Sequence, residues 1–440
     1  MSKFFTLHLK SGQTFETSSN LTQMPPGVYL EERKWTERPI NDASSDVVAF
    51  VGYTEKATYS ENIGFGDFSN VGIYDDSLVF RPVRISSFVE FTRVFGGEKV
   101  TLDNNYLYFN IKLFFENGGG ECLVVSVRNN KDGLFADDLI KGLDSLKNDF
   151  QHSLLVIPEA ACLPSLEDSL RVQRAMLRHC SDGGNTRFAI LDIFGGFSSD
   201  GDPVNNFRNG IGDNSGYKDD ADSDIYNKCL ESGAAYYPWV KVFNEFSFKE
   251  VAIPASGGVA AQYLHQQWKV GIWKAPANIS IKHLTNVCVD LAESEIVSIT
   301  TPPDGKVSVN VIRKVPYSEP LIWGSRTLTK VNSIYRFINV KRTIDMIECS
   351  IRYSLTEHQY DENNPETWQR VEDRIKKYLE SLRLRGALPG AMSQESYKVS
   401  AGPLKEIEAL KKDKITSSDK IAVFVSVAVT LPGVFVELGE

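Results

Sequence analysis

The feature that most constrains the fold is an alternation of short apolar runs with amphipathic helical patterns between residues 47 and 193. The runs are rich in aliphatic residues and lack polar alternation, as strands buried on both faces do. Strand–helix–strand repeats join parallel neighbours through right-handed crossovers, so a layered α/β domain with a mostly parallel, doubly wound sheet is predicted. The expected strands are 47–52, 122–127, 154–157 and 188–193, and the expected helices are 106–116, 134–147 and 166–179.

The stretch 251–281 joins this layered domain to a second domain. Its apolar run is followed by Ser256-Gly257-Gly258, where glycine permits a tight turn into a helix, and Pro276 prevents that helix from running on. We expect this joint to pass load between the two domains. The expected organisation is a leader and exchanging arm at 1–46, a layered domain at 47–278 with a loop-rich insertion at about 54–80, an α+β domain at 279–400, and a linker with an exchanging strand at 401–440.

The expected second domain combines strands with one clearly delimited helix. The turn sequence PPDG at 302–305, between β-branched runs, predicts a hairpin. The pattern at 334–353 fits a strand and a helix equally. Asn364 and Pro365 are typical of a helix start, and Gly386 of its end. A solvated face or an electrostatic contact with an acidic partner would explain the basic residues on one side of this helix: Arg370, Arg374, Lys377 and Arg385.

Both ends of the chain carry strand-like runs that need partners. The run 421–429 is apolar at nearly every position, and a strand of this kind is not left as an open edge. The early run 28–32 has few apolar neighbours with which to build a core. We therefore expect both to pair with other subunits through Val28, Tyr29, Leu30, Glu31, Val423, Val425, Val427 and Val429.

Composition excludes several classes of function. The chain has 48 basic and 57 acidic residues among 440, and a net charge of −9 disfavours a general coat for nucleic acid. The N-terminus lacks the features of a secretory signal, and the most apolar segment, 421–431, is too short for a membrane helix. The six cysteines are scattered singly, which is typical of reduced packing residues and not of a metal site.

The sequence contains only weak signals for catalytic or metal-binding groups. Ser256 follows Pro254 where the nucleophile-elbow pattern needs glycine, so the layered domain could share a hydrolase- or subtilase-like scaffold without its catalytic residues. The acidic run between Asp213 and Asp224 does not follow the register of a calcium-binding loop. The six histidines show no ligand-like spacing. We expect no cofactor, and keep an α/β-hydrolase- or subtilase-like enzyme as the rival class.

Five blocks, in order along most of the chain, resemble contractile tail sheath proteins of bacteriophages and related phage-tail-like injection systems. The central one, at 254–261 and 271–278, is similar to the signature of that family. The blocks are PGVYLEE at 26–32, AFVGYT at 49–54, PASGGVAA with GIWKAPAN at 254–261 and 271–278, NVIR with IWGSRTL at 310–313 and 322–328, and RFINVKR at 336–342.

The resemblance implies a structural subunit of a contractile sheath, which stacks as rings around an inner tube and contracts to drive the tube through a target envelope. The implied partners are other sheath subunits, the tube protein, and baseplate and terminal cap proteins, with no nucleic acid and no membrane insertion. Assembly in the cytoplasm of a bacterium or viral host is implied, in a particle that is then released. It also implies that the helix carrying Arg370, Arg374, Lys377 and Arg385 faces the tube. The leader at 1–24 and the insertion fit either a main sheath protein or a minor paralogue near the baseplate.

Overall fold

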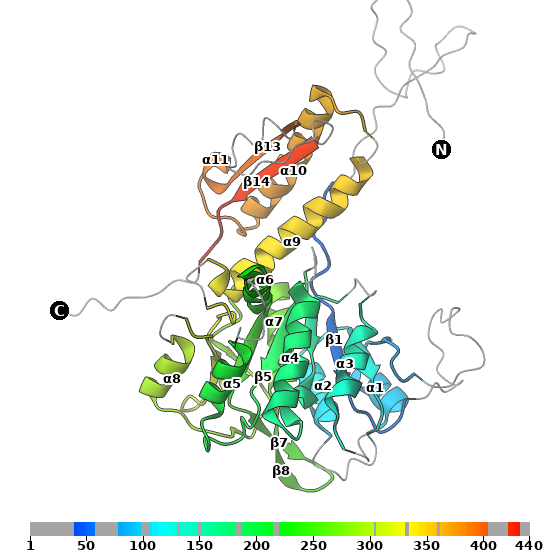
Figure 1. Cartoon of the computed structure of the whole chain (residues 1–440), viewed down its shortest axis with the longest axis vertical. Coiled ribbons are helices and arrows are strands. Elements are labelled where there is room, and N and C mark those ends of the chain that lie inside the picture. The colour runs from blue at the N-terminus through cyan, green and yellow to red at the C-terminus, as the bar shows by residue number, and fades with distance from the viewer. Residues whose placement is uncertain are drawn as a thin grey trace, which may run out of the picture. The chain divides into compact units, whose positions relative to one another are not determined.

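The structure is a computed structural model, in which the chain forms two compact units, Met1–Ile40 and Asn41–Glu440. All helices and strands below belong to the second unit (Figure 1). The expected arm residues Val28, Tyr29, Leu30 and Glu31, and most of the expected insertion, lie outside the described residues. The structure describes residues 39–57, 78–97, 105–129, 133–147, 152–181, 186–213, 220–302, 305–330, 334–358, 361–403 and 421–431.

A nine-stranded sheet forms the centre of the described part, in the order β2-β3-β1-β4-β5-β6-β11-β12-β9. Neighbours from β3 to β11 run parallel, whereas the strands at both edges run antiparallel. The large, mostly parallel sheet is thus confirmed. Its strands are β1 (Val48–Gly52), β2 (Val83–Ile85), β3 (Cys122–Ser126), β4 (Leu154–Val156), β5 (Phe188–Asp192), β6 (Gly233–Tyr237), β9 (Ile279–Ser280), β11 (Asn310–Arg313) and β12 (Leu321–Trp323).

Helices cover both faces of this sheet (Figure 1). One apolar core lies under α1 (Phe88–Phe95), α2 (Tyr106–Glu116) and α7 (Ser256–Lys269). The other lies under α3 (Ala136–Asp144), α4 (Leu166–Ser181), α5 (Pro203–Ile211), α6 (Asp220–Glu231) and α8 (Glu293–Thr300). Successive side chains of a strand point to opposite faces, so Val48 and Phe50 enter the first core and Ala49 and Val51 the second. This two-sided burial explains why β1 is apolar throughout.

The sheet continues past the domain boundary expected at residue 278. β9, β11 and β12 all follow that residue, and β11 pairs directly with β6 of the layered domain. The first strands of the expected α+β domain at 279–400 thus complete the layered sheet. β11 covers the side of β6 that would otherwise be an open edge, whereas the intervening strands β7, β8 and β10 form a separate sheet.

The hairpin expected at 302–305 is wrong, because α8 precedes that turn. Ile296 and Ile299, three residues apart, are both buried against the second core. The Ala292 amide donates to Glu295 Oε2 over 2.8 Å and caps the first turn of the helix. Helical spacing and this cap outweigh the β-branched content that suggested a strand. The hairpin is formed instead by β11 and β12.

Residues 233–244 form two strands that belong to different sheets. β6 ends at Tyr237, and β7 (Val240–Asn244) enters a second sheet between β10 (Asn286–Val287) and β8 (Lys249–Ile253). Among the segments between these elements are the short 3₁₀ helices η2 (Pro158–Cys162), η3 (Ile334–Arg336) and η4 (Thr356–His358).

The C-terminal region is built on two long helices. The ambiguous segment at 334–353 is mostly helix, α9 (Ile338–Leu355), and the capped helix is α10 (Pro365–Leu384). The Asn364 side chain accepts a hydrogen bond from the Thr367 amide over 2.9 Å, as its cap position predicts. α11 (Ser393–Ser396) and β13 (Tyr397–Pro403) follow, and β14 (Ile421–Val427) pairs antiparallel with β13. The buried stripe of α10 comprises Val371, Ile375, Tyr378, Leu379 and Leu382.

Candidate assembly sites and the joint between domains

The terminal strand exists, but its partner lies in its own chain. Val423 of β14 is opposite Ala401, and Val427 is opposite Tyr397. Val425 also lies in β14, whereas Val429 follows its end. In the isolated chain β13 supplies the main-chain hydrogen bonds to this strand, so its pairing with another subunit stays a prediction. β13 and β14 form a two-stranded sheet, so among the described residues each has one edge without a strand neighbour.

The four basic residues of α10 do not form one solvated face. Arg374 is only 8% exposed, and its guanidinium contacts Glu357 Oε2 at 2.8 Å. Arg370 contacts Asp361 Oδ2 at 3.0 Å, and Arg385 reaches both carboxylate oxygens of Asp42. Lys377 is exposed.

Arg374 is thus engaged within its own chain, and its contact with a tube stays a prediction. Acidic side chains from the turn before α10 and from the residue 42 region neutralise the arginines of this helix within the chain. Sequence spacing gave no signal for these pairings, since the Asp42–Arg385 contact spans most of the chain.

A buried arginine lies where α9 meets α7. Arg342 is 4% exposed and donates to the Ser45 carbonyl oxygen at 3.1 Å and to Gln267 Oε1 at 2.9 Å. Its guanidinium carbon lies 5.4 Å from the centre of the Tyr263 ring, a cation–π contact. Burial lowers the pKa of Arg342 to about 10, so the side chain stays charged at neutral pH. The cation therefore joins α9, α7 and the segment that precedes β1.

The segment from Asp42 to Ser45, called the strap below, is held by side chains of several elements. Asp42 accepts from Tyr378 Oη at 3.0 Å as well as from Arg385. The Ala43 amide donates to Ser350 Oγ at 2.8 Å, and the Ser44 carbonyl accepts from Thr186 Oγ1 at 2.9 Å. The strap therefore contacts α9, α10 and the layered domain within four residues. Sequence analysis missed it, because a short polar segment carries no periodic pattern.

The expected joint at 256–278 also contacts the C-terminal region. Asn339, near the start of α9, donates through Nδ2 to the carbonyl oxygens of Trp273 and Thr430, each over 3.0 Å. The guanidinium of Arg385 lies 5.7 Å from the Trp273 ring centre. Trp273 thus links the joint to α9 and to the end of α10, and Asn339 connects it further to the residues after β14.

Carboxyl side chains lie at positions that often hold catalytic groups in α/β enzymes, and here they cap helices. Active sites of this fold class gather at the carboxyl ends of the parallel strands. Asp192, at the end of β5, accepts through Oδ1 from the amides of Ala255 and Ser256 at 2.8 and 3.1 Å. Glu159, after β4, accepts from the Leu107 amide at 2.9 Å. Ser256 thus offers its backbone to a carboxylate, and both carboxyl groups stabilise the first turns of α7 and α2.

Burial raises the pKa of both carboxyl groups. The pKa of Glu159 rises to about 8 and that of Asp192 to about 7, in each case mainly through loss of water. Perturbed carboxyls are often catalytic, but these two are 1% and 4% exposed. Their geometry is that of structural caps.

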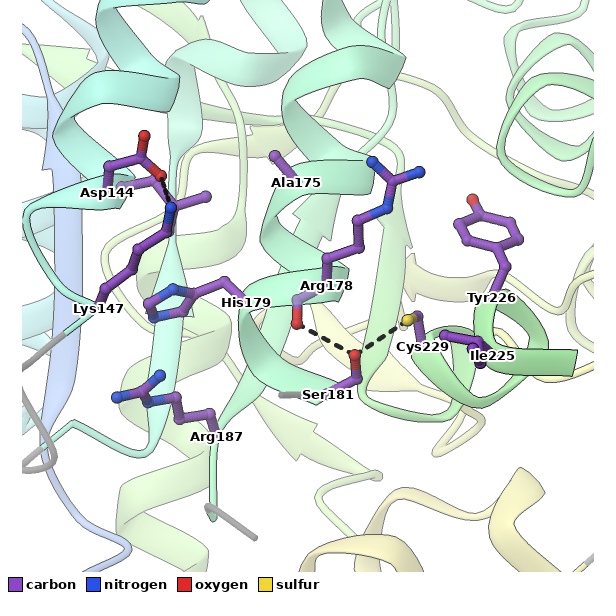
Figure 2. A pocket seen from close by; sticks show the side chains of 11 residues that line it. Asp144, Lys147, Ala175, Arg178, His179, Ser181, Arg187, Ile225, Tyr226 and Cys229 are labelled. Atoms are coloured by element: carbon purple, nitrogen blue, oxygen red, sulfur yellow. Dashed lines mark hydrogen bonds and ion pairs between the residues drawn. The ribbon is translucent and has the colours of Figure 1, made fainter. Parts of the chain in front are cut away.

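A cavity of about 720 Å³ opens between α3, α4 and α6 (Figure 2). In its wall Lys147 Nζ contacts Asp144 Oδ1 at 2.9 Å, and Cys229 Sγ lies 2.9 Å from Ser181 Oγ. Burial lowers the pKa of His179 to about 4, so the imidazole is neutral at neutral pH. Within the described residues this wall presents no nucleophile activated by a base.

Neither a metal site nor a membrane span is found in the described chain. No group of three or more His, Cys, Asp or Glu side chains in that part of the molecule could hold a metal ion. Part of the acidic run between Asp213 and Asp224 lies outside the described residues, namely 214–219. None of the helices that the structure describes is both long enough and apolar enough to cross a bilayer.

Comparison with a family model identifies the C-terminal region. Residues 330–435 match the model described as phage tail sheath C-terminal domain, a range that contains α9, α10, β13 and β14. A search of curated proteins gave no match.

Solved structures share the fold over nearly the whole chain. A chain of the contracted helical sheath of the anti-feeding prophage is 24% identical, with a TM-score of 0.68, and the match covers 95% of this chain and 99% of that one. A chain of the contracted PVC sheath complex, an extracellular contractile injection system, is 22% identical with a TM-score of 0.63, covering 97% and 98%. A sheath tail protein from Desulfitobacterium hafniense is 9% identical with a TM-score of 0.54, covering 85% and 93%.

Proposed function

We propose that this chain, a member of the contractile tail sheath family, is a structural subunit that polymerises as stacked rings around an inner tube and contracts to drive the tube through a target envelope. One observation carries the proposal: the fold likeness to contracted sheath chains spans 95–97% of this chain, and the C-terminal region matches the sheath domain model. The buried caps Asp192 and Glu159 are consistent with a structural role, because neither is accessible to a substrate.

The partners follow from this role. Copies of the same chain are its principal partners, and baseplate proteins are expected at one end, since a chain of the anti-feeding prophage baseplate shares the fold. An inner tube and a terminal cap are proposed as further partners, with no part for nucleic acid. Assembly is proposed in the cytoplasm of a bacterium or viral host. The layered domain is proposed to share a hydrolase- or subtilase-like scaffold, with Ser256 as the first residue of α7, where its amide is capped by Asp192.

Purified full-length chain would test the proposal, alone and mixed with the inner-tube protein of the same particle. Tubular particles with a regular axial repeat are expected by electron microscopy, with the chain forming their outer layer. A chain that stays monomeric under both conditions, at concentrations where other sheath subunits polymerise, would contradict the proposed function.

Strand exchange is proposed for assembly. Because β14 pairs with β13 in the isolated chain, the exchange would replace this pairing with the same pairing between two subunits. β14 is only partly buried in the isolated subunit, and the segment that links it to β13 is long enough for it to reach another chain. A swapped β14 would make the same main-chain hydrogen bonds with a neighbour's β13, so exchange costs little in pairing energy. The early strand with Val28 and Tyr29 is proposed to add to an edge of this two-stranded sheet.

Contact with the tube is proposed through the exposed side of α10. Lys377 is the exposed member of the basic set, and the side chains of Arg370 and Arg385 remain 44% and 45% exposed although each is paired. Exposed charge pairs contribute about 0–1 kcal/mol each, so such a contact is weak in one subunit and significant when repeated in every ring. A weak, repeated contact suits a tube that must be released on contraction.

A further inference from the structure

The β7–β8 hairpin ends in a cluster of exposed aromatic side chains. Phe243, Phe246 and Phe248 are 47%, 49% and 80% exposed. The rings of Phe243 and Phe248 contact each other edge to face, with centres 6.4 Å apart. Exposed clusters of this kind mark interaction sites more often than scattered apolar residues do.

The hairpin turn holds Phe248 outward. Asn244 Oδ1 accepts from the Phe246 amide over 2.9 Å, which fixes the start of the turn. Phe248 itself has a φ of +53°, in the left-handed region that glycine, asparagine and aspartate adopt more readily than a bulky residue. Glycine would suit this backbone better, so the phenyl ring is retained against a local conformational cost. Such a cost is typical of a residue with a functional contact.

A cavity of about 270 Å³ lies beside the same hairpin, between α2, β7 and the turn before β10. Its volume exceeds the roughly 150 Å³ that holds a benzene molecule, so a phenyl ring fits by size. The lining is mixed, because Lys112 and Glu245 also line the cavity and their charged groups lie 3.1 Å apart. Phe243 already lines it, whereas Phe248 remains largely in solvent. The apolar part of the lining comprises Phe109, Leu113, Val242, Phe243 and Leu284.

The wall of this cavity is formed before any ligand arrives. Asn117, which ends α2, accepts from the Lys282 amide at 2.8 Å and donates to the Lys282 carbonyl oxygen at 3.0 Å. The Thr285 amide donates to the Lys241 carbonyl oxygen of β7 at 2.9 Å. The turn is thus fixed to both elements that flank the cavity, which reduces the entropy lost on docking.

We propose that Phe248, with Phe246 beside it, docks into this cavity on a second copy of the chain; this inference rests on the proposed function and adds a contact between subunits. The charges agree, because exposed Lys249 follows Phe248 and exposed Glu116, whose Oε1 lies 3.8 Å from Lys112 Nζ, stands at the rim of the cavity. Phe243 belongs both to the tip and to the cavity lining, so each subunit carries one tip beside one cavity. A contact that is not reciprocated between the same two copies repeats from subunit to subunit and generates rings or open helical arrays.

The first test replaces Phe248 with glycine in the full-length chain. Phe248→Gly removes the ring and relieves the left-handed backbone, so the monomer should unfold at the same urea concentration as the wild type or a higher one. The critical concentration for assembly should rise about tenfold, measured by sedimentation and electron microscopy. The matched control is Tyr317→Gly, because Tyr317 is also fully exposed with a positive φ, of 60°, and lines no part of the cavity.

The second test identifies the docking site. Chains carrying only Phe248→Cys and chains carrying only Leu284→Cys are mixed, assembled and oxidised. A disulfide-linked dimer is expected in the mixture and not in either variant alone.

The outcomes separate this inference from the proposed function. If the wild type assembles and the Phe248→Gly variant assembles equally well, the inference is overturned and the proposed function stands. Loss of assembly without the mixed disulfide overturns the assignment of the cavity. A wild type that never assembles removes the proposed function, and this inference with it.

Discussion

Arg342 is the residue on which the polar contacts of the joint converge. Its two hydrogen bonds end on a carbonyl oxygen and a side-chain amide oxygen, and an aromatic face supplies the third contact. A cation surrounded by these dipoles is stabilised without a carboxylate in direct contact, so the interaction depends on the exact positions of Ser45, Gln267 and Tyr263. Such an arrangement orients α9 against α7 more specifically than apolar packing alone does.

Replacing Arg342 with leucine should destabilise the chain by about 1–3 kcal/mol, because the buried Ser45 carbonyl oxygen and the partly buried Gln267 Oε1 lose their donor. Urea unfolding followed by circular dichroism would measure this loss. Arg352→Leu, at an exposed position of the same helix that pairs with Glu348, is the control and should change stability by less than about 0.5 kcal/mol. Equal effects of the two substitutions would show that Arg342 contributes no more than a surface arginine.

The carboxyl group of Glu159 should make stability depend on pH. Its folded pKa, about 8, lies above the value of 4.5 for an exposed glutamate, so the folded chain holds the proton more tightly than the unfolded chain. The resulting stabilisation is complete below about pH 4.5 and is lost as pH rises toward 8, with a slope of at most about 1.4 kcal/mol per pH unit from this group. Asp192, with a pKa of about 7, acts in the same direction.

Glu159→Gln, which mimics the protonated group, should flatten the fall in unfolding free energy between pH 5 and pH 8. Chemical unfolding at each pH would measure the slope. Glu167→Gln, at an exposed position of α4, is the matched control and should leave the profile unchanged. A wild-type profile that rises over this range would refute the role assigned to Glu159.

At the scale of elements, the proposed exchange of β14 between subunits can be tested by cross-linking. Ala401 and Val423 face each other across β13 and β14, so cysteines at both positions can form a disulfide. In particles assembled from an Ala401→Cys, Val423→Cys chain, strand exchange predicts a ladder of linked subunits on a non-reducing gel. In the unassembled chain the same bond should form within one molecule.

The register gives a control for this experiment. Val425 faces Val399 and is displaced from Ala401, so an Ala401→Cys, Val425→Cys chain should cross-link poorly in either state. A single monomeric band from assembled particles of the first variant would show that β14 stays with its own β13.

The exposed side of α10 makes a separate prediction. Lys377→Glu should reduce the yield of extended particles that contain a tube, since the reversed charge repels an acidic tube in every subunit. Electron microscopy would count extended, contracted and empty sheaths. Lys314→Glu, an exposed lysine in the loop between β11 and β12, carries the same charge change and should leave the counts unchanged. The proposed contact fails if the two variants behave alike.

Sequence patterns predicted the elements whose signals are local. The buried run of β1, the alternation up to β5, and the Asn364 cap with Pro365 at the start of α10 all depend on residues within one turn or strand. Pairings between distant segments were not predictable, because β11 reaches β6 and Asp42 reaches Arg385 only after the chain has folded. The same limit applies to the burial of Arg374, whose acidic partner Glu357 belongs to another element.

At the scale of the whole molecule, the strap and the joint tie the described C-terminal elements to the layered domain at several points. Asp42 binds α10, Ser45 binds Arg342 of α9, and Trp273 contacts both helices. These contacts are polar and directional, so bending between the two regions would break several of them together. We therefore expect contraction to move each subunit as a nearly rigid body, while the segments that connect subunits change direction.

Comparing extended and contracted particles of this chain by electron microscopy would test the expectation. The contacts Asp42–Arg385 and Arg342–Gln267 should be present in both states, and the angle between α7 and α9 should stay nearly constant. The change should be concentrated before residue 42 and between β13 and β14, the segments through which the proposed strand exchange would connect subunits. Because a rigid subunit can alter ring diameter only through those segments, a variant shortened by several residues within 404–420 should assemble but contract incompletely. A large bend at 271–278, with Asn339 separated from the Trp273 carbonyl, would instead place the hinge inside the subunit and refute the rigid-body account.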